Sequence, residues 1–135
     1  MSLKMSFQVD TSGIDDLLTK HPQNKRRFMD AVAERAVALM DLSFNTSPDG
    51  LSYPRGSGRT HVASQAGFPP NVDSGTLRDS LRWERSGDDR EIHGAEYALY
   101  LEDSTELNRP FIGPAIEEAN QDVPALGKRF LDGGL

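Results

Sequence analysis

Cysteine is absent from the 135 residues of this chain. Its absence excludes disulfide bonds, thiolate catalysis and every zinc or iron–sulfur site that depends on cysteine ligands. Long apolar runs are missing too, since no stretch approaches the roughly 18 apolar residues that a membrane-spanning helix needs. The beginning of the chain carries neither the basic region nor the apolar region of a secretory signal. These absences fit an intracellular protein.

Positive charge is in short supply. The chain has 15 Lys and Arg residues against 21 Asp and Glu residues, which gives a formal net charge of −6. Neutralising nucleic-acid phosphates requires clustered cations, so this balance argues against a general nucleic-acid binder. The chain length and the hydrophobic fraction of 36% predict one soluble domain with a single, modest core.

The first part of the chain predicts a strand followed by a short helix. Residues 6–10 alternate between apolar and polar side chains, as a half-buried strand does. Residues 1–4 are interpreted as a remnant of an expression vector, with Met5 as the native start, and are left out of the predicted fold. The helix is expected from Ile14 to about Lys20, capped by Ser12 and ended by Pro22.

The strongest periodic segment runs from residue 24 to residue 44 and predicts a long helix. The acidic side chains Asp30 and Glu34 fall on the face opposite the apolar stripe. Lys25, Arg26 and Arg27 crowd the start of this helix, where cations oppose the helix dipole. We interpret them as a solvated helix end rather than a contact surface. The apolar stripe comprises Met29, Val32, Ala33, Ala36, Val37, Leu39, Met40 and Phe44.

Residues 46–73 differ from the rest of the chain in composition. They contain four prolines and four glycines and few aliphatic side chains. A stretch of this length without regular structure is uncommon inside a compact domain and is usually functional or disordered. We therefore expect a long mobile loop or arm that becomes ordered on assembly.

Regular structure is expected to resume at Ser74. Residues 76–80 predict one helical turn, and residues 81–95 predict a hairpin whose turn is S-G-D-D-R. Residues 97–102 form either a short helix or a third strand. Pro114 suits the first position of a C-terminal helix, which Pro124 then kinks or breaks. The predicted core contains Met29, Val32, Ala36, Met40, Trp83, Ile92, Tyr97, Phe111 and Ile116.

The resulting fold class is α+β, with one long helix and a C-terminal helix packed on a small antiparallel sheet and a long mobile loop. Catalytic chemistry finds little support in the sequence. His21, His61 and His93 lie far apart, and none has a partner at metal-ligand spacing. Glu102, which precedes D-S-T in an apolar context, is interpreted as a structural hydrogen-bonding group rather than an acid catalyst. The sequence therefore predicts no catalytic site, no cofactor and no metal.

Residues 53–60 invite comparison with a phosphate-binding loop. Tyr53 stands where that motif requires its first glycine, and Arg59 stands where it requires lysine. No apolar strand precedes the segment and no helix clearly follows it, although the mechanism needs both. We interpret the segment as part of the flexible loop.

Two further segments carry a recognisable pattern. Residues 67–81 contain G-x-P-P followed by S-G-x-L-x-x-S, and residues 97–105 read Y-A-L-Y-L-E-D-S-T before N-R-P-F-I-G-P-A at residues 108–115. In their order and spacing, after a strand and a long helix, these segments resemble the tail-component family of tailed bacteriophages. That family includes tail-completion or neck proteins. Ser104 stands where the family has glycine, so the turn there differs from the family pattern.

The resemblance implies a structural protein at the joint between phage head and tail. Such a protein has an α+β fold, forms a homo-oligomeric ring and uses no cofactor. Its partners are other copies of itself and other tail or neck proteins, with no sequence-specific nucleic acid and no membrane. It is located in the host cytoplasm during assembly and then in the virion. The residues expected to contribute to assembly or to the family motif are Tyr53, Arg55, Arg59, Pro70, Gly75, Leu77, Tyr97, Glu102, Arg109, Pro110 and Phe111.

Physical reasoning fits some of these residues to that role. Gly75 allows a tight turn before Leu77, and Arg109-Pro110 gives a rigid, extended entry to the last helix with Phe111 as an anchor. Each subunit of a ring needs two different contact surfaces, and a long loop is one means of reaching a neighbour.

Three other interpretations remain open. A tail terminator also forms a ring and belongs to the same structural class. A small prophage-encoded enzyme or nuclease would use Glu102 and His93. An adaptor would bind a host protein through the loop of residues 46–73.

Overall fold

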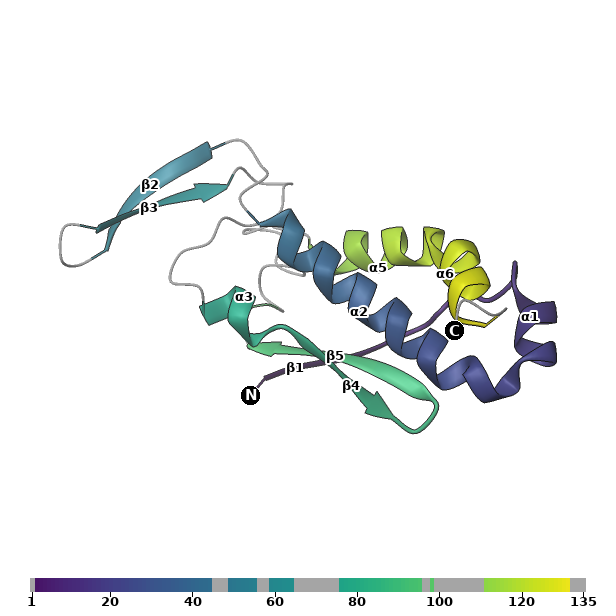
Figure 1. Ribbon diagram of the computed structural model, residues 1–135. Helices are drawn as coiled ribbons and strands as arrows, with labels where there is room; N and C mark the ends of the chain where they lie inside the picture. The colour runs from purple at the N-terminus through teal and green to yellow at the C-terminus, as the bar shows by residue number, and fades with distance from the viewer. Residues whose placement is uncertain are drawn as a thin grey trace.

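The computed structural model describes residues 2–44, 49–55, 59–64, 76–95, 98 and 111–131. Over these residues the fold is α+β, as predicted, with a long helix lying across a three-stranded antiparallel sheet (Figure 1). The elements are β1 (Ser2–Phe7), α1 (Asp15–Lys20), the 3-10 turn η1 (Pro22–Asn24), α2 (Lys25–Ser43), β2 (Asp49–Arg55), β3 (Arg59–Ser64), α3 (Thr76–Ser80), β4 (Arg82–Ser86), β5 (Asp89–Ala95), α5 (Ile112–Gln121) and α6 (Val123–Phe130).

The three-stranded sheet has the order β1-β5-β4, and both pairings are antiparallel. The predicted hairpin is confirmed, and Gly87 in its turn has a φ of 61°, which glycine adopts without strain. Side chains alternate between the faces of a strand. The register therefore puts Trp83 with Ile92, and Arg85 with Arg90, on the same face. Ile92 is fully buried, so this is the face that α2 covers.

The N-terminal part of the chain differs from the prediction in two ways. Strand β1 begins at Ser2 and pairs with β5 up to Phe7, so residues 2–4, which the predicted fold left out, belong to the sheet. The apolar alternation of Met5 and Phe7 reaches back to the first residues, and pairing with the central strand extends along it. Ser12 is not the cap of α1, because the helix begins at Asp15, and the backbone N–H of Ser12 donates to Asp10 Oδ1 at 3.1 Å. The buried Ile14 occupies the cap position instead.

Helix α2 forms the centre of the core, close to its predicted bounds. It contacts β4 and β5 of the sheet and also α5 and α6 (Figure 1). Phe28, which the predicted stripe missed, is fully buried, whereas Met29, Trp83 and Ile116 are only half-buried. The buried apolar core consists of Phe7, Ile14, Phe28, Val32, Ala33, Ala36, Met40, Phe44, Leu81, Ile92, Ala98, Phe111, Ile112, Ala115, Ala119, Val123 and Leu131.

The C-terminal helices rest chiefly on α2. Helix α5 begins at Ile112, two residues before Pro114, because Phe111 and Ile112 are both buried and fix its start. The predicted break at Pro124 is confirmed, since Pro124 is the second residue of α6. At this junction Arg35 of α2 donates its Nε–H to Asp122 Oδ2 at 2.8 Å. The junction is therefore tied to α2 by charge as well as by apolar packing.

Residues 46–73 contain regular structure that the sequence prediction missed. Strands β2 and β3 pair antiparallel to each other and form a separate two-stranded sheet. Figure 1 shows this hairpin extending away from the body of α2 and the three-stranded sheet. Two strand-like segments, at residues 49–55 and 59–64, flank the short G-S-G link at residues 56–58. A short link that contains glycine between two such segments is typical of a hairpin. The high proline and glycine content concealed it.

Candidate assembly surfaces

The β2–β3 hairpin carries three of the residues expected to contribute to assembly. Tyr53 is paired with His61, and Arg55 is paired with Arg59 at the end of the hairpin far from the body (Figure 1). Like charges placed directly opposite each other on a sheet destabilise the pairing. The register therefore brings two arginine positions together at the projecting tip of the hairpin.

The rest of the predicted set divides into described and undescribed residues. Phe111 is 1% exposed, and its ring centroid lies 5.5 Å from that of Phe44 at an interplanar angle of 52°. The expectation that it anchors the entry to α5 is confirmed. Leu77 lies in α3. Six predicted residues lie outside the described part of the chain: Pro70, Gly75, Tyr97, Glu102, Arg109 and Pro110.

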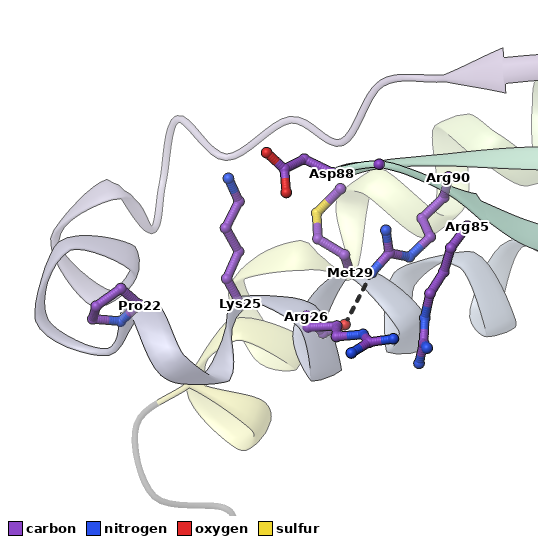
Figure 2. A pocket seen from close by; sticks show the side chains of 8 residues that line it. Pro22, Lys25, Arg26, Met29, Arg85, Asp88 and Arg90 are labelled. Carbon is purple, nitrogen blue, oxygen red and sulfur yellow. Dashed lines mark hydrogen bonds between the residues drawn. The ribbon is translucent and has the colours of Figure 1, made fainter.

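A basic pocket of about 550 Å³ lies where the start of α2 meets the turn between β4 and β5 (Figure 2). It is half open to solvent, and four of its side chains are cationic. Figure 2 shows Lys25 and Arg26 on the first turn of α2 and Arg85 and Arg90 on the facing strands. The lining consists of Pro22, Lys25, Arg26, Met29, Arg85, Gly87, Asp88 and Arg90.

Asp30 of α2 organises the two strand arginines of the pocket. Its Oδ1 accepts hydrogen bonds from Arg85 Nε at 3.0 Å and from Arg90 Nε at 2.9 Å, and its Oδ2 accepts a third from Arg85 Nη2. The side chain of Arg90 is 2% exposed, whereas that of Arg85 is 43% exposed. A single carboxylate therefore holds one buried guanidinium and one exposed guanidinium.

These contacts lower the pKa of Asp30 below its ordinary value. The hydrogen bonds from Arg85 contribute most, burial acts in the opposite direction, and Arg90 adds to the lowering. The same pairing raises the pKa of Arg85. Asp30 therefore stays charged down to a lower pH than an ordinary aspartate does.

Two further hydrogen bonds hold the side chain of Arg90. Its Nη1 donates to the carbonyl of Asp89 at 2.8 Å. Its Nη2 donates to the carbonyl of Arg26 at 3.3 Å, the bond drawn in Figure 2. The bond to Arg26 joins β5 to the first turn of α2. The wall of the pocket is consequently fixed by hydrogen bonds, while Lys25 and Arg26 extend exposed side chains beside it.

The first turn of α2 adds to the positive potential of the pocket. Asn24 at the cap position makes no side-chain bond to the helix, and its Nδ2 donates to the carbonyl of Leu131 at 3.1 Å. The first turn contains no acidic residue. The positive end of the helix dipole therefore reinforces the cations of Lys25 and Arg26.

Sequence reasoning misassigned the two acids that face this site. Asp30 and Glu34 were expected opposite the buried stripe, yet they contact the hairpin, and Glu34 Oε2 accepts a hydrogen bond from Trp83 Nε1 at 2.7 Å. One available signal was the S-G-D-D-R turn. It sets Arg85 opposite Arg90, and two cations so placed need a nearby carboxylate.

The opposite face of the sheet carries a second charged cluster. His93 lies between two glutamates, with Nδ1 3.0 Å from Glu84 Oε2 and Nε2 3.3 Å from Glu91 Oε1. Lys4 lies 3.9 Å from Glu91, and Arg82 lies 3.6 Å from Glu84. This pattern is that of charge pairing within a sheet. The distance between His93 and Glu102, the pair that an enzyme would use, is not described, because Glu102 lies outside the described residues.

Two chemical alternatives can be compared with the structure. Within the described ranges, no group of three or more His, Asp or Glu side chains is arranged to hold a metal ion. Arg59 and Thr60 begin strand β3 rather than a helix, so the segment lacks the helix N-terminus that a phosphate-binding loop uses.

None of the described helices has both the length and the apolar character that a membrane span requires.

Comparison with known proteins gives no match to a protein-family model, to a curated protein or to a solved structure.

Proposed function

We propose that this chain is a structural assembly protein of a tailed bacteriophage or prophage. It completes the tail or joins head to tail as a homo-oligomeric ring, and it performs no catalysis. Its partners are copies of itself and other tail or neck proteins. The motif resemblance at residues 67–81 and 97–115 suggests this role, and the β2–β3 hairpin is the structural observation that carries it.

The physical argument starts from the stability of the hairpin. An isolated two-stranded hairpin is marginally stable in water, because it has no second layer against which to bury a face. Strands β2 and β3 pair only with each other among the described strands, and Figure 1 shows them standing apart from the core. A neighbouring subunit supplies the missing surface. The unpaired outer edges of both strands offer backbone groups for that contact.

A ring imposes a matching requirement on the body of the molecule. Each subunit must present one surface to the neighbour on one side and a different surface to the neighbour on the other side. A hairpin that projects from one end of α2 provides one of these two surfaces. The opposed Arg55 and Arg59 at its tip favour an acidic receiving surface, and the net charge of −6 makes other copies of the chain suitable.

Replacement of residues 49–64 by a short Gly-Ser linker tests the proposal. Both strands are removed together, and they form a separate sheet that stands apart from the body in Figure 1, so we expect the circular dichroism spectrum and the melting temperature to change little. Complementation in a phage or lysogen that lacks the gene should yield no infectious particles. Normal titres with the linker variant would refute the role of the hairpin.

A side-chain variant serves as the matched control. Tyr53→Ser, Arg55→Ser and Arg59→Ser combined keep the hairpin backbone while removing its anchoring groups. Loss of titre in this variant as well assigns the contact to the side chains, whereas retained titre assigns it to the strand edges. Electron microscopy of particles made without the protein separates the two ring functions. Unjoined heads beside normal tails indicate neck completion, and overlong tails indicate a tail terminator.

A further inference from the structure

We infer that the basic pocket at the start of α2 is a docking site for an acidic peptide segment of a different protein. The pocket was not among the surfaces expected from the sequence, which treated Lys25 and Arg26 as a solvated helix end. Its affinity for acidic peptides does not depend on membership of a virion. This inference and the proposed function can therefore fail separately.

The charge balance of the pocket is the first observation. Lys25, Arg26, Arg85 and Arg90 line it, while the nearby carboxylates are Asp88 in the lining and Asp30 behind the two strand arginines. Four cations against two carboxylates leave a local excess of two positive charges. The chain as a whole carries a net charge of −6, so this excess is a local exception.

The unfavourable interaction of Lys25 and Arg26 with the helix dipole is the second observation. Lys25 and Arg26 occupy the helix turn where cations are least favourable and acids most favourable. The contacts of the pocket wall do not require their charged groups, because the bond from Arg90 is made to the backbone carbonyl of Arg26. An anionic partner bound beside Lys25 and Arg26 offsets their repulsion from the positive end of the helix dipole, and this gain contributes to binding.

The shape and chemistry of the pocket favour carboxylates. Asp30 already holds both strand arginines, so the exposed Lys25 and Arg26 are the cations of the lining most open to carboxylates of a partner. Its presence also lowers the local charge that a dianionic phosphate would meet. Nucleic acid is disfavoured because the negative charge of the whole chain repels a long polyanion. The side chains of Lys25 and Arg26 are exposed, so a segment on the surface of another protein can reach them.

The place of the pocket in the fold argues for a different protein rather than a second copy. The pocket lies at the start of α2, and the β2–β3 hairpin extends from the other end of that helix (Figure 1). The pocket and the hairpin tip with Arg55 and Arg59 are both cationic and do not complement each other. Contact between neighbouring copies through the hairpin therefore leaves the pocket available for another chain.

The test uses fluorescein-labelled hexaglutamate as the probe and fluorescence anisotropy with the full chain as the readout. We expect binding that weakens as salt is added. The variant Lys25→Glu with Arg26→Glu should bind at least about tenfold more weakly. The matched control, Lys4→Glu with Arg82→Glu, makes the same change in net charge on the opposite face of the sheet, away from the β4–β5 turn, and should stay within about twofold of the parent.

Stability measurements keep loss of folding apart from loss of binding. Acids on the first turn of a helix favour its dipole, so Lys25→Glu with Arg26→Glu should melt at or above the temperature of the parent chain. Sedimentation should show the same oligomeric state for the parent and this variant.

Four results would overturn the inference. They are no binding by the parent chain, equal loss in both double variants, stronger displacement of the probe by pyrophosphate than by unlabelled hexaglutamate, and a change of oligomeric state in the Lys25→Glu, Arg26→Glu variant. The third result would assign the pocket to phosphate ligands. The fourth would assign it to contact between copies of the chain. Hairpin deletion and infectivity measurements have no bearing on any of these outcomes.

Discussion

Removal of the Asp30 carboxylate should be among the most damaging single changes outside the apolar core. In Asp30→Ala the guanidinium of Arg90, which is 2% exposed, keeps its backbone bonds but loses its counter-charge. Breaking a buried ion pair by removing one partner costs roughly 3–5 kcal/mol. The side chain of Asp30 is itself 21% exposed, and Arg85 can turn to solvent, so we expect about 3 kcal/mol. For a chain of this length the melting temperature should fall by about 10 °C.

Two variants make this test specific. Asp41→Ala removes a carboxylate from the same helix, but its ion pair with Arg78 is exposed and 3.6 Å long, so it should cost less than about 0.5 kcal/mol. Asp30→Ala combined with Arg90→Met removes both buried partners and should be more stable than Asp30→Ala alone. Denaturant unfolding of these three variants and of Arg90→Met alone gives the four free energies that the comparison needs. If the losses from Asp30→Ala and Arg90→Met simply add in the double variant, the two groups do not act as a pair.

The same carboxylate predicts a dependence on pH. The pKa of Asp30 is lowered in the folded chain, so its stabilising contribution is fully present above the ordinary value of 3.8. It is lost as the pH falls below 3.8 and through the lower folded pKa. The difference in unfolding free energy between the parent and Asp30→Ala should therefore shrink in that window. A difference that stays constant below pH 3.8 would contradict the assignment.

Three further changes test the packing. Trp83→Ala should cost about 2–3 kcal/mol in urea unfolding, less than a fully buried tryptophan would, and Trp83→Phe should recover most of this; a loss above about 5 kcal/mol would mean that the indole is fully buried. Phe111→Ala should cost about 4 kcal/mol, and a double-mutant cycle with Phe44→Leu should give a coupling of about 0.5–1.5 kcal/mol; simple additivity would contradict the ring contact. Gly127→Ala should destabilise α6 despite the better helix propensity of alanine, because the new Cβ would lie 3.0 Å from Ile14 Cγ2; a higher melting temperature would show that Ile14 yields.

Local patterns in the sequence predicted some elements of the fold and missed others, such as the β2–β3 hairpin. The apolar spacing from residue 24 to residue 44 predicted α2, and the S-G-D-D-R turn predicted the β4–β5 hairpin, although its strands extend into the predicted turn, to Ser86 and from Asp89. Both features depend on residues close together in the chain. The start of α5 was placed two residues too late because the proline rule ignores burial, whereas the anchoring of Phe111 decides the boundary.

The pocket depends on contacts that no local pattern encodes. Asp30 meets Arg85 and Arg90 across 55 and 60 residues of sequence, and the face of α2 that carries Asp30 reads as solvent-facing by polarity alone. Glu34 lies on the same polar face of α2 and was assigned to solvent for the same reason, although it accepts a hydrogen bond from Trp83. A charged residue on a polar helix face is normally solvated, so only the packing of the hairpin against α2 reveals this role.

The pairing of β1 with β5 has a consequence for how the chain folds during synthesis. Ser2 pairs with Ala95 and Phe7 with Arg90, so β1 is synthesised before β5, the central strand with which it pairs. Asn120 of α5 also bonds the backbone just after β1, accepting from the N–H of Asp10 at 2.8 Å and donating to the carbonyl of Gln8 at 3.1 Å. Closure of loops this long is entropically costly and slows folding. Folding is therefore completed after most of the chain has been synthesised, and until then the apolar face of β1 is exposed to chaperones.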